Sequence, residues 1–280
     1  MQKSLNWLPI HESHAIDVMA VKVDFAQQLP LLLLRKVLRI AEAKAFEAGL
    51  KSRHSVGMNI PVPIEGPPIV FRGIQGQLFN DLAEPAEGAP VGRKIAEQLQ
   101  VDQQSITYRT WRYVSWSWQI ERLRTMILPV MEEMSGVVAL SAVQLEYLDK
   151  FRLDAEPEEG SIKLIIRQGC ELVPPHVLEK AGLWHSYTGS FLPSSDGTRQ
   201  LELVNIDVVD QPNAETPTQT RWMNILTVRQ DTFSPEALET GGASGAEVFE
   251  VLASMHPQLK RLLGRIITDE LSARIFLRST

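Results

Sequence analysis

The amino-acid sequence predicts an α+β fold in which antiparallel sheet regions are each packed by a long helix. Residues 143–153 alternate apolar and polar side chains, which is typical of a half-buried antiparallel strand. Two segments, 115–134 and 246–275, place apolar side chains at helical spacing. The predicted strands are grouped between these helices and do not alternate with them. This grouping favours antiparallel pairing over a parallel sheet.

The first half of the chain is predicted to run strand, helix, strands, long helix. Pro30 in the first turn and Gly49 just past the end bound the helix at 30–48. Pro129 is expected to kink the long helix at 115–134. The segment 82–92, which is rich in proline and glycine, is expected to be a loop. The predicted strands are 15–25, 56–62, 69–74 and 105–114.

The second half begins with the strand at 143–153, in which Asp149 falls on the apolar face. A carboxylate there needs a hydrogen-bond partner or local exposure. Asp196-Gly197, between two alternating runs, indicates a hairpin. The helix at 246–275 is expected to be interrupted at His256-Pro257. The remaining predicted elements are a strand at 161–168, a short helix at 174–183, strands at 184–192, 200–210 and 221–232, and a loop at 211–220.

The similar order of elements in the two halves predicts a two-fold pseudo-repeat. Its halves would be residues 1–135 and 136–280, divided near Gly136, although no residues are repeated between them. One continuous domain built from the same elements is the alternative.

Composition narrows the class of protein. A net charge of −6 argues against a generic nucleic-acid binder, because phosphate contacts need a basic surface. The single cysteine, Cys170, rules out an internal disulfide and fits a reducing cytosol. The N-terminal residues do not resemble a signal peptide, and the longest apolar run, 31–34, is too short to span a bilayer. We therefore expect a cytoplasmic protein that does not enter a membrane.

A polar pair is predicted inside the sheet. Asn205 and Asp207 share one face of the strand at 200–210, and Asn205 would bond to Asp149 if the two strands were neighbours. The favoured interpretation is a polar cross-strand pair that sets the strand register. The alternative is an acid/base pair in a cleft, with Asp149 and Asp207 as weak catalytic candidates.

Residues 108–124 interleave aromatic rings with arginines. We expect Arg109 and Trp111 to face outward, and Tyr108, together with Ile106 and Val114, to face the core. Such a segment can pack the core, form a protein interface or grip single-stranded nucleic acid, the last being disfavoured here. The predicted interface residues are Arg109, Trp111, Trp116 and Trp118, and the predicted positive rim consists of Arg109, Arg112, Arg122 and Arg124.

Other chemical motifs are incomplete. His11 and His14 lack the spacing of a metalloprotease helix, and no further histidine or cysteine cluster completes a metal site. Ser244, followed by Glu247, predicts a helix cap rather than a phosphate site. Cys170 lies in no nucleophile motif. The sequence therefore predicts neither a metal nor a cofactor.

Five short segments carry a family resemblance: Tyr113-Val114-Ser115-Trp116, Glu146-Tyr147-Leu148-Asp149, Asn205-Ile206-Asp207, Leu252-Ala253-Ser254-Met255-His256 and Ile267-Thr268-Asp269-Glu270. From about residue 105 to the end, their order and rough spacing resemble a family of sporadically distributed bacterial proteins of similar length with no established activity. The resemblance implies an α+β fold and a bacterial or phage origin. It supplies no catalytic residues.

The sequence predicts a non-enzymatic protein-interaction module, because it holds no convincing catalytic constellation. The resemblance suggests a subunit, adaptor or sensor of a bacterial multi-protein system, and the sporadic distribution suggests anti-phage defence. Its partner would be another protein or a second copy of the chain. The alternative is an enzyme or small-ligand-binding protein with a cleft near Asp149, Asn205 and Asp207.

Overall fold

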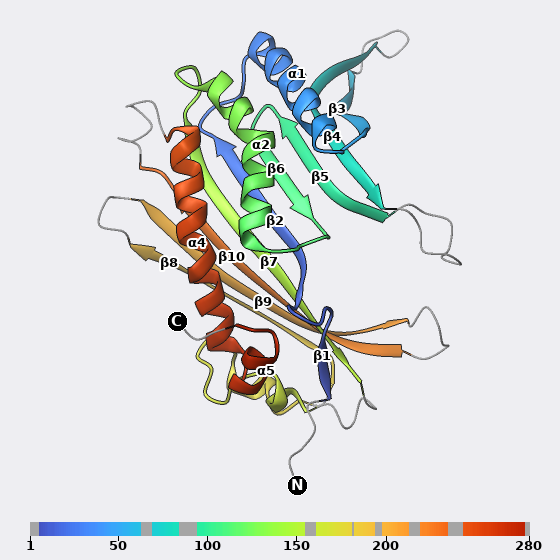
Figure 1. Cartoon of the computed structure of the whole chain (residues 1–280), viewed down its shortest axis with the longest axis vertical. Coiled ribbons are helices and arrows are strands. Elements are labelled where there is room, and N and C mark those ends of the chain that lie inside the picture. Colours follow the sequence, from blue (N-terminus) through green and yellow to red (C-terminus); the bar gives the residue numbers. More distant parts are fainter. Residues whose placement is uncertain are drawn as a thin grey trace. The chain divides into compact units, whose positions relative to one another are not determined.

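The computed structural model describes residues 6–62, 69–83, 94–154, 161–180, 182–193, 198–212, 219–234 and 243–277. These residues form ten antiparallel strands and four α-helices, which confirms the predicted α+β fold (Figure 1). The strands are β1 (Trp7–Pro9), β2 (Ile16–Phe25), β3 (Ser52–Val62), β4 (Ile69–Ala83), β5 (Lys94–Asp102), β6 (Ser105–Thr110), β7 (Leu140–Leu153), β8 (Trp184–Pro193), β9 (Arg199–Pro212) and β10 (Gln219–Thr232).

The helices begin and end largely where local signals predict. Gly49 follows the first helix with a positive φ of 95°, a backbone conformation that glycine adopts without strain. The Ser115 hydroxyl accepts a hydrogen bond of 3.3 Å from the backbone N–H of Trp118 and so caps the second helix. The helices are α1 (Leu31–Glu47), α2 (Trp116–Met134), α4 (Gly245–Ile266) and α5 (Asp269–Arg274).

The chain forms two compact units. The first unit comprises Met1–Met19, Gln144–Asp231 and Leu252–Thr280, and the second comprises Ala20–Val143 and Thr232–Val251. Strands β2, β7 and β10 and helix α4 contribute residues to both units. The pseudo-repeat and its division near Gly136 stay predictions.

In the second unit, the strand order is β3-β4-β5-β6-β2-β7. Helices α1 and α2 lie side by side, and α1 packs on β4 and β5 (Figure 1). Both helices bury their apolar stripes, which are Leu34, Val37, Leu38 and Ala41 in α1 and Leu123, Met126, Ile127 and Val130 in α2. This packing places the start of α2 beside the end of α1.

In the first unit, the strand order is β7-β10-β9-β8, and β1 also pairs with β7. Alternate residues of β7 are buried, including Leu145, Tyr147 and Phe151, as the alternation at 143–153 predicts. The buried residues of β9 are Val204, Ile206 and Val208. The side chains of Asn205 and Asp207 therefore lie on the other, half-exposed face of β9.

The predicted strand at 161–168 is wrong. These residues form a 3-10 helix, Ile162–Leu164, and then one isolated bridge between Ile166 and Ile267. Ile162, Ile165 and Ile166 are all buried, and their spacing suits one helical turn better than alternation along a strand. The Thr268 hydroxyl donates a 3.0 Å hydrogen bond to the Leu164 carbonyl, which ties this turn to the start of α5.

Other boundaries also differ from the prediction. Strand β5 was not predicted, and the short helix at 174–183 is only a 3-10 turn, Pro175–Val177. Helix α4 continues through Pro257, and the helical segment breaks instead after Ile266, where Thr268 caps α5. The hairpin turn predicted at 194–197 and most of the predicted loops at 82–92 and 211–220 lie outside the described residues.

Replacing Leu263 by alanine tests the buried stripe of α4. Leu263 is buried in the first unit, so Leu263→Ala should lower the free energy of unfolding by about 2–5 kcal/mol through lost burial and a residual cavity. Denaturant titration measures the loss. Leu32→Ala is the matched control, because Leu32 is 81% exposed. A loss below about half a kcal/mol for Leu263→Ala would remove this residue from the core.

Candidate functional site

A buried carboxylate organises the second unit. Glu97 lies in β5 and is fully buried, on the same face as Leu99 and Val101. Its neighbour across the sheet is Thr110 of β6, which is also buried. An ionised carboxyl group in this position needs positive charge and hydrogen-bond donors around it.

Arg122 of α2 supplies the positive charge. Its Nε donates a 2.6 Å hydrogen bond to Glu97 Oε1, and its Nη2 donates a 2.6 Å hydrogen bond to the carbonyl of Ala48 at the end of α1. The Tyr108 hydroxyl donates to the same carboxylate oxygen, and the Gln119 amide donates to that hydroxyl. We call these four side chains, Glu97, Tyr108, Gln119 and Arg122, the Glu97 cluster.

The surroundings of Tyr108 and Arg122 shift the pKa values of both side chains upward. Burial, with the neighbouring charge of Glu97, raises the pKa of Tyr108 above its ordinary value, so the phenol remains a neutral donor. The hydrogen bond to Glu97 raises the pKa of Arg122, which therefore stays a cation. Tyr108, Gln119 and Glu97 are buried, so the cluster serves to position Arg122 and offers no exposed reacting group.

A groove opens where α1 ends and α2 begins. Its volume is about 670 Å³, and Arg122 connects it to the Glu97 cluster. The Trp118 ring is 41% exposed, and the Arg122 guanidinium lies over it at 5.3 Å from the ring centroid. We call this the Trp118 groove; its lining residues are Lys44, Glu47, Ala48, Ser117, Trp118, Glu121, Arg122 and Thr125.

The other aromatic residues of the segment 108–124 are placed differently. Tyr108 is buried and Trp111 is 37% exposed, as expected, whereas Trp116 is half-buried. The expectation that Val114 is a core residue is wrong, because β6 ends at Thr110 and Val114 is 59% exposed. Arg109 is half-buried, and its Nη1 donates to Gln98 Oε1 at 3.4 Å.

The predicted arginine rim is largely paired within the chain. Arg112 donates a 2.9 Å hydrogen bond to Asp81, and Arg122 is bound to Glu97. Arg124 lies 3.9 Å from Glu121 and stacks on the Phe249 ring at 4.5 Å from its centroid. Three of the four arginines therefore have an acidic partner already, which weakens the expectation of an acidic binding partner.

The predicted bond between Asp149 and Asn205 does not form. Strand β10 lies between β7 and β9, so these two residues are not on neighbouring strands. Asn205 instead donates a 2.9 Å hydrogen bond to Asp207 two residues along the same strand. Asp149 is only 2% exposed, and burial raises the pKa of its carboxyl group to about 7.

A second titratable group, the half-buried His256, lies in the same unit. The Tyr147 hydroxyl and His256 Nδ1 are 2.9 Å apart, and the two rings meet edge to face. Burial, and secondly the charge of Lys260, lowers the pKa of His256 to about 4. The imidazole is therefore neutral at neutral pH.

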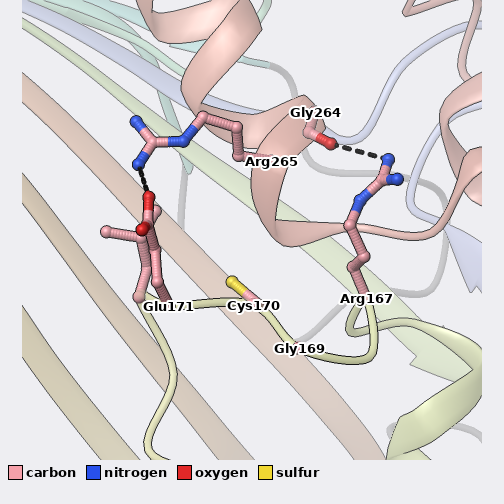
Figure 2. Close-up of a pocket in the computed structure, with 7 residues that line it drawn as sticks. Arg167, Gly169, Cys170, Glu171, Gly264 and Arg265 are labelled. Atoms are coloured by element: carbon pink, nitrogen blue, oxygen red, sulfur yellow. Dashed lines mark hydrogen bonds and ion pairs between the residues drawn. The ribbon is translucent and has the colours of Figure 1, made fainter.

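A smaller pocket of about 350 Å³ lies beside Cys170 in the first unit (Figure 2). Arg167 donates a 3.0 Å hydrogen bond to the Gly264 carbonyl and a 2.7 Å hydrogen bond to Asp269. Arg265 donates to Glu171 (Figure 2). Both guanidinium groups are thus engaged by acidic side chains, and the buried Cys170 also lines the pocket. This pocket offers no unpaired charge to an anionic ligand.

Chemical groups for metal binding do not gather in the described part of the chain. His11 and His14 have ring centroids 4.6 Å apart, but no group of three histidine, cysteine, aspartate or glutamate side chains is placed to hold a metal ion among the described residues.

No described helix is both long enough and apolar enough to cross a bilayer. Comparison with protein-family models and with curated proteins finds no match to this chain.

Sequence reasoning missed the centre of the site. It named Arg122 as a rim residue and Tyr108 as a core residue, but it did not identify Glu97 or Gln119. One signal was present: Glu97, Leu99 and Val101 alternate with glutamines, which places a carboxylate on an apolar strand face. The partner of that carboxylate lies 25 residues away, on a helix, and no local pattern connects the two.

Removing Arg122 tests the cluster. Arg122→Met leaves the buried Glu97 with only the more distant guanidinium of Arg112, at 3.7 Å, and should lower the free energy of unfolding by about 3–5 kcal/mol. The double variant Glu97→Gln with Arg122→Met removes both charges and should lose less than the single variant. Denaturant titration measures both. Arg53→Met is the control, because the pair between Arg53 and Glu42 is solvent-exposed and contributes little. Equal losses for Arg53→Met and Arg122→Met would contradict the assignment.

Replacing Asp149 by asparagine tests its burial. Between about pH 4 and pH 7 the folded carboxyl group holds a proton that the unfolded chain releases, so its contribution to stability falls as pH rises. The free energy of unfolding of Asp149→Asn, relative to that of the wild type, should therefore increase across this range by on the order of 4 kcal/mol and level off above it. Unfolding curves at pH 4 to 9 measure this difference.

The comparison with the wild type at each pH is essential, because His256 has the opposite dependence. Its folded pKa lies below its ordinary value, so its contribution is lost as pH falls from about 6.5 towards 4. Asp207→Asn is the matched control for loss of a sheet carboxyl group, since Asp207 accepts a hydrogen bond from Asn205. A gain for Asp149→Asn that is the same at pH 5 and pH 8 would rule out the buried carboxyl group as its cause.

Proposed function

We propose that this protein is a non-enzymatic protein-interaction module that docks a partner protein in the Trp118 groove. The exposed Trp118 ring, stacked with Arg122, carries the proposal. Arg122 donates hydrogen bonds to Glu97 and to the Ala48 carbonyl, so its guanidinium group is held in place. The Trp118 ring that stacks on this group is therefore ordered before a partner binds. Aromatic and arginine side chains on such rigid supports supply much of the energy of protein interfaces.

The lining of the groove suggests the chemistry of the partner. Lys44 and Glu47 form an ion pair of 2.7 Å, and Glu121 lies near Arg122, so charges of both signs surround the aromatic ring. A partner with one apolar anchor side chain, flanked by polar groups of both signs, suits this lining. A nucleic acid suits it poorly, because Glu47 and Glu121 would repel phosphate groups and Arg122 is already paired.

The proposed setting is a bacterial multi-protein system, in which this chain is a subunit, adaptor or sensor. This part of the proposal rests on the resemblance of residues 105 onward to the sporadically distributed bacterial family, and a role in anti-phage defence rests on that distribution alone.

An enzyme or small-ligand-binding protein acting near Asp149 is the second candidate. The observation in its favour is a buried carboxyl group whose pKa is raised to about 7, a feature that functional sites share. Neither the Trp118 groove nor the pocket beside Cys170 is lined by Asp149, Asn205 or Asp207. If Asp149→Asn abolishes a measured activity and leaves the protein stable, this second candidate replaces the first.

The Trp118 groove is tested with the partner that co-purifies from the native operon and is identified by mass spectrometry. Trp118→Ala should weaken binding of that purified partner at least about tenfold, because the ring would be buried on binding. Titration calorimetry measures the affinity. Leu32→Ala is the control, an exposed apolar residue outside the groove lining, and should bind like the wild type. Unchanged affinity in Trp118→Ala would refute the groove as the docking site.

The double variant Arg109→Ala with Trp111→Ala tests whether the interface extends to these two residues. Trp111 is partly exposed and lies beyond the end of β6, so circular dichroism should show a retained fold. Lost capture of the same partner then extends the interface to this segment. An unfolded variant assigns the segment to the core, and retained capture confines the interface to the Trp118 groove.

A further inference from the structure

Strand β8 is an open edge of the first unit. It ends the strand order and pairs only with β9 among the described residues. The pairing runs from Trp184 opposite Val208 to Pro193 opposite Arg199 without a register shift. The backbone N–H and C=O groups on the other side of such a strand are available to a further strand. Figure 1 shows β8 at the end of the series β7, β10, β9, β8.

This edge lacks the features that usually protect one. Trp184–Pro193 contains no lysine, arginine, aspartate or glutamate, and its only proline is the last residue. It is ten residues long and has no bulge within its pairing to β9. Charged side chains, internal prolines, bulges and short length are the usual defences against unwanted pairing. Their absence indicates that the edge is used.

Two large rings stand exposed on one face of β8. Tyr187 is 67% exposed and Phe191 is 65% exposed, and Gly189 lies midway between them on the same face. Arg199 lies over the Phe191 ring at 5.7 Å from its centroid. The order Tyr-x-Gly-x-Phe is complementary to itself when it is paired antiparallel.

We propose that β8 pairs antiparallel with β8 of a second copy of this chain, which joins the two first units in a two-fold dimer. In the register that places Gly189 on the two-fold axis, Tyr187 of each copy lies opposite Phe191 of the other. One contact thus forms two identical aromatic cross-strand pairs, as a two-fold interface requires.

Charge permits a second copy as the occupant. Each chain carries a net charge of −6, so two copies repel each other overall, and a contact between them must avoid placing carboxylates opposite each other. An edge without carboxylates lets them meet without placing like charges opposite each other. The same uncharged strip provides no ionic selectivity for an acidic or a basic peptide, whereas its aromatic spacing matches itself.

This contact is independent of the proposed docking function. The β8 residues lie in the first unit, and the Trp118 groove is built entirely from residues of the second unit. Loss of one interaction therefore leaves the other measurable.

Sedimentation equilibrium of the full chain over a range of micromolar concentrations tests the dimer. The wild type should dimerise, and Tyr187→Lys and Phe191→Lys should each raise the dissociation constant at least tenfold, since each places a charge at the contact twice. Leu32→Lys is the control and should dimerise like the wild type. Circular dichroism confirms that the variants fold. A wild type that stays monomeric up to 100 µM overturns the proposal, as does a dimer that both lysine variants retain.

Cysteine cross-linking tests the register. A Cβ atom added at Gly189 would meet no atom closer than the Glu202 carbonyl oxygen at 3.6 Å, so Gly189→Cys fits the strand. In a Cys170→Ser background, mild oxidation of Gly189→Cys should give covalent dimers, because residues opposite each other in an antiparallel pair have Cα atoms about 4.5–5.5 Å apart, within the range that a disulfide spans. Ser190→Cys is the control and should cross-link much less, since it lies opposite Thr188 of the other copy. Equal or greater cross-linking of Ser190→Cys overturns the register.

Discussion

The second unit depends on one constraint: the buried carboxylate of Glu97 must have a cation. Arg122 meets this requirement and, with the same guanidinium, accommodates the Ala48 carbonyl at the end of α1. A positive charge at a helix C-terminus is itself favourable. The Arg122 side chain of α2 therefore binds both the carboxylate of β5 and the C-terminal end of α1. The position of α2 against α1 follows from this arrangement, and so does the placement of Trp118 at the mouth of the groove.

In the first unit, the buried Asp231 also lies beside a cation, the side chain of Arg229. Asp149 is buried without such a cation among the described residues and is accommodated differently. The Arg229 side chain is nearly buried, donates to Gln200, and lies 3.7 Å from Glu202 and 3.5 Å from Asp231. Glu202 is also 3.5 Å from Arg265, whose side chain is exposed, so the ion pairs extend from the buried Arg229 to the surface. Asp149 is instead accommodated by a raised pKa, which makes it neutral over the acidic range. Burying a neutral acid costs much less than burying an unpaired carboxylate.

The two exposed aromatic sites differ in what supports them. Trp118 stacks with Arg122, which is held in place by the buried carboxylate of Glu97. The surroundings of Trp118 are therefore preorganised, which suits the proposed docking of a different protein. Tyr187 and Phe191 lie on an edge strand whose backbone hydrogen-bonding groups are the principal attraction, so their surroundings suit another strand. The two proposed interactions therefore differ in kind: a side-chain surface for a partner protein, and a backbone edge for a second copy of the chain.

The sequence by itself determined those elements whose signals are local. Alternation at 143–153 predicts β7, Gly49 and Ser115 mark helix ends, and the alternating runs at 184–192 and 200–210 predict neighbouring strands. Only the tertiary structure decided which distant residues meet. It placed β10 between β7 and β9, which separates Asp149 from Asn205, and it brought Arg122 to Glu97 across 25 residues. The physical reason is that periodicity reports which face of an element is buried, whereas strand order and charge pairing depend on how the whole chain closes.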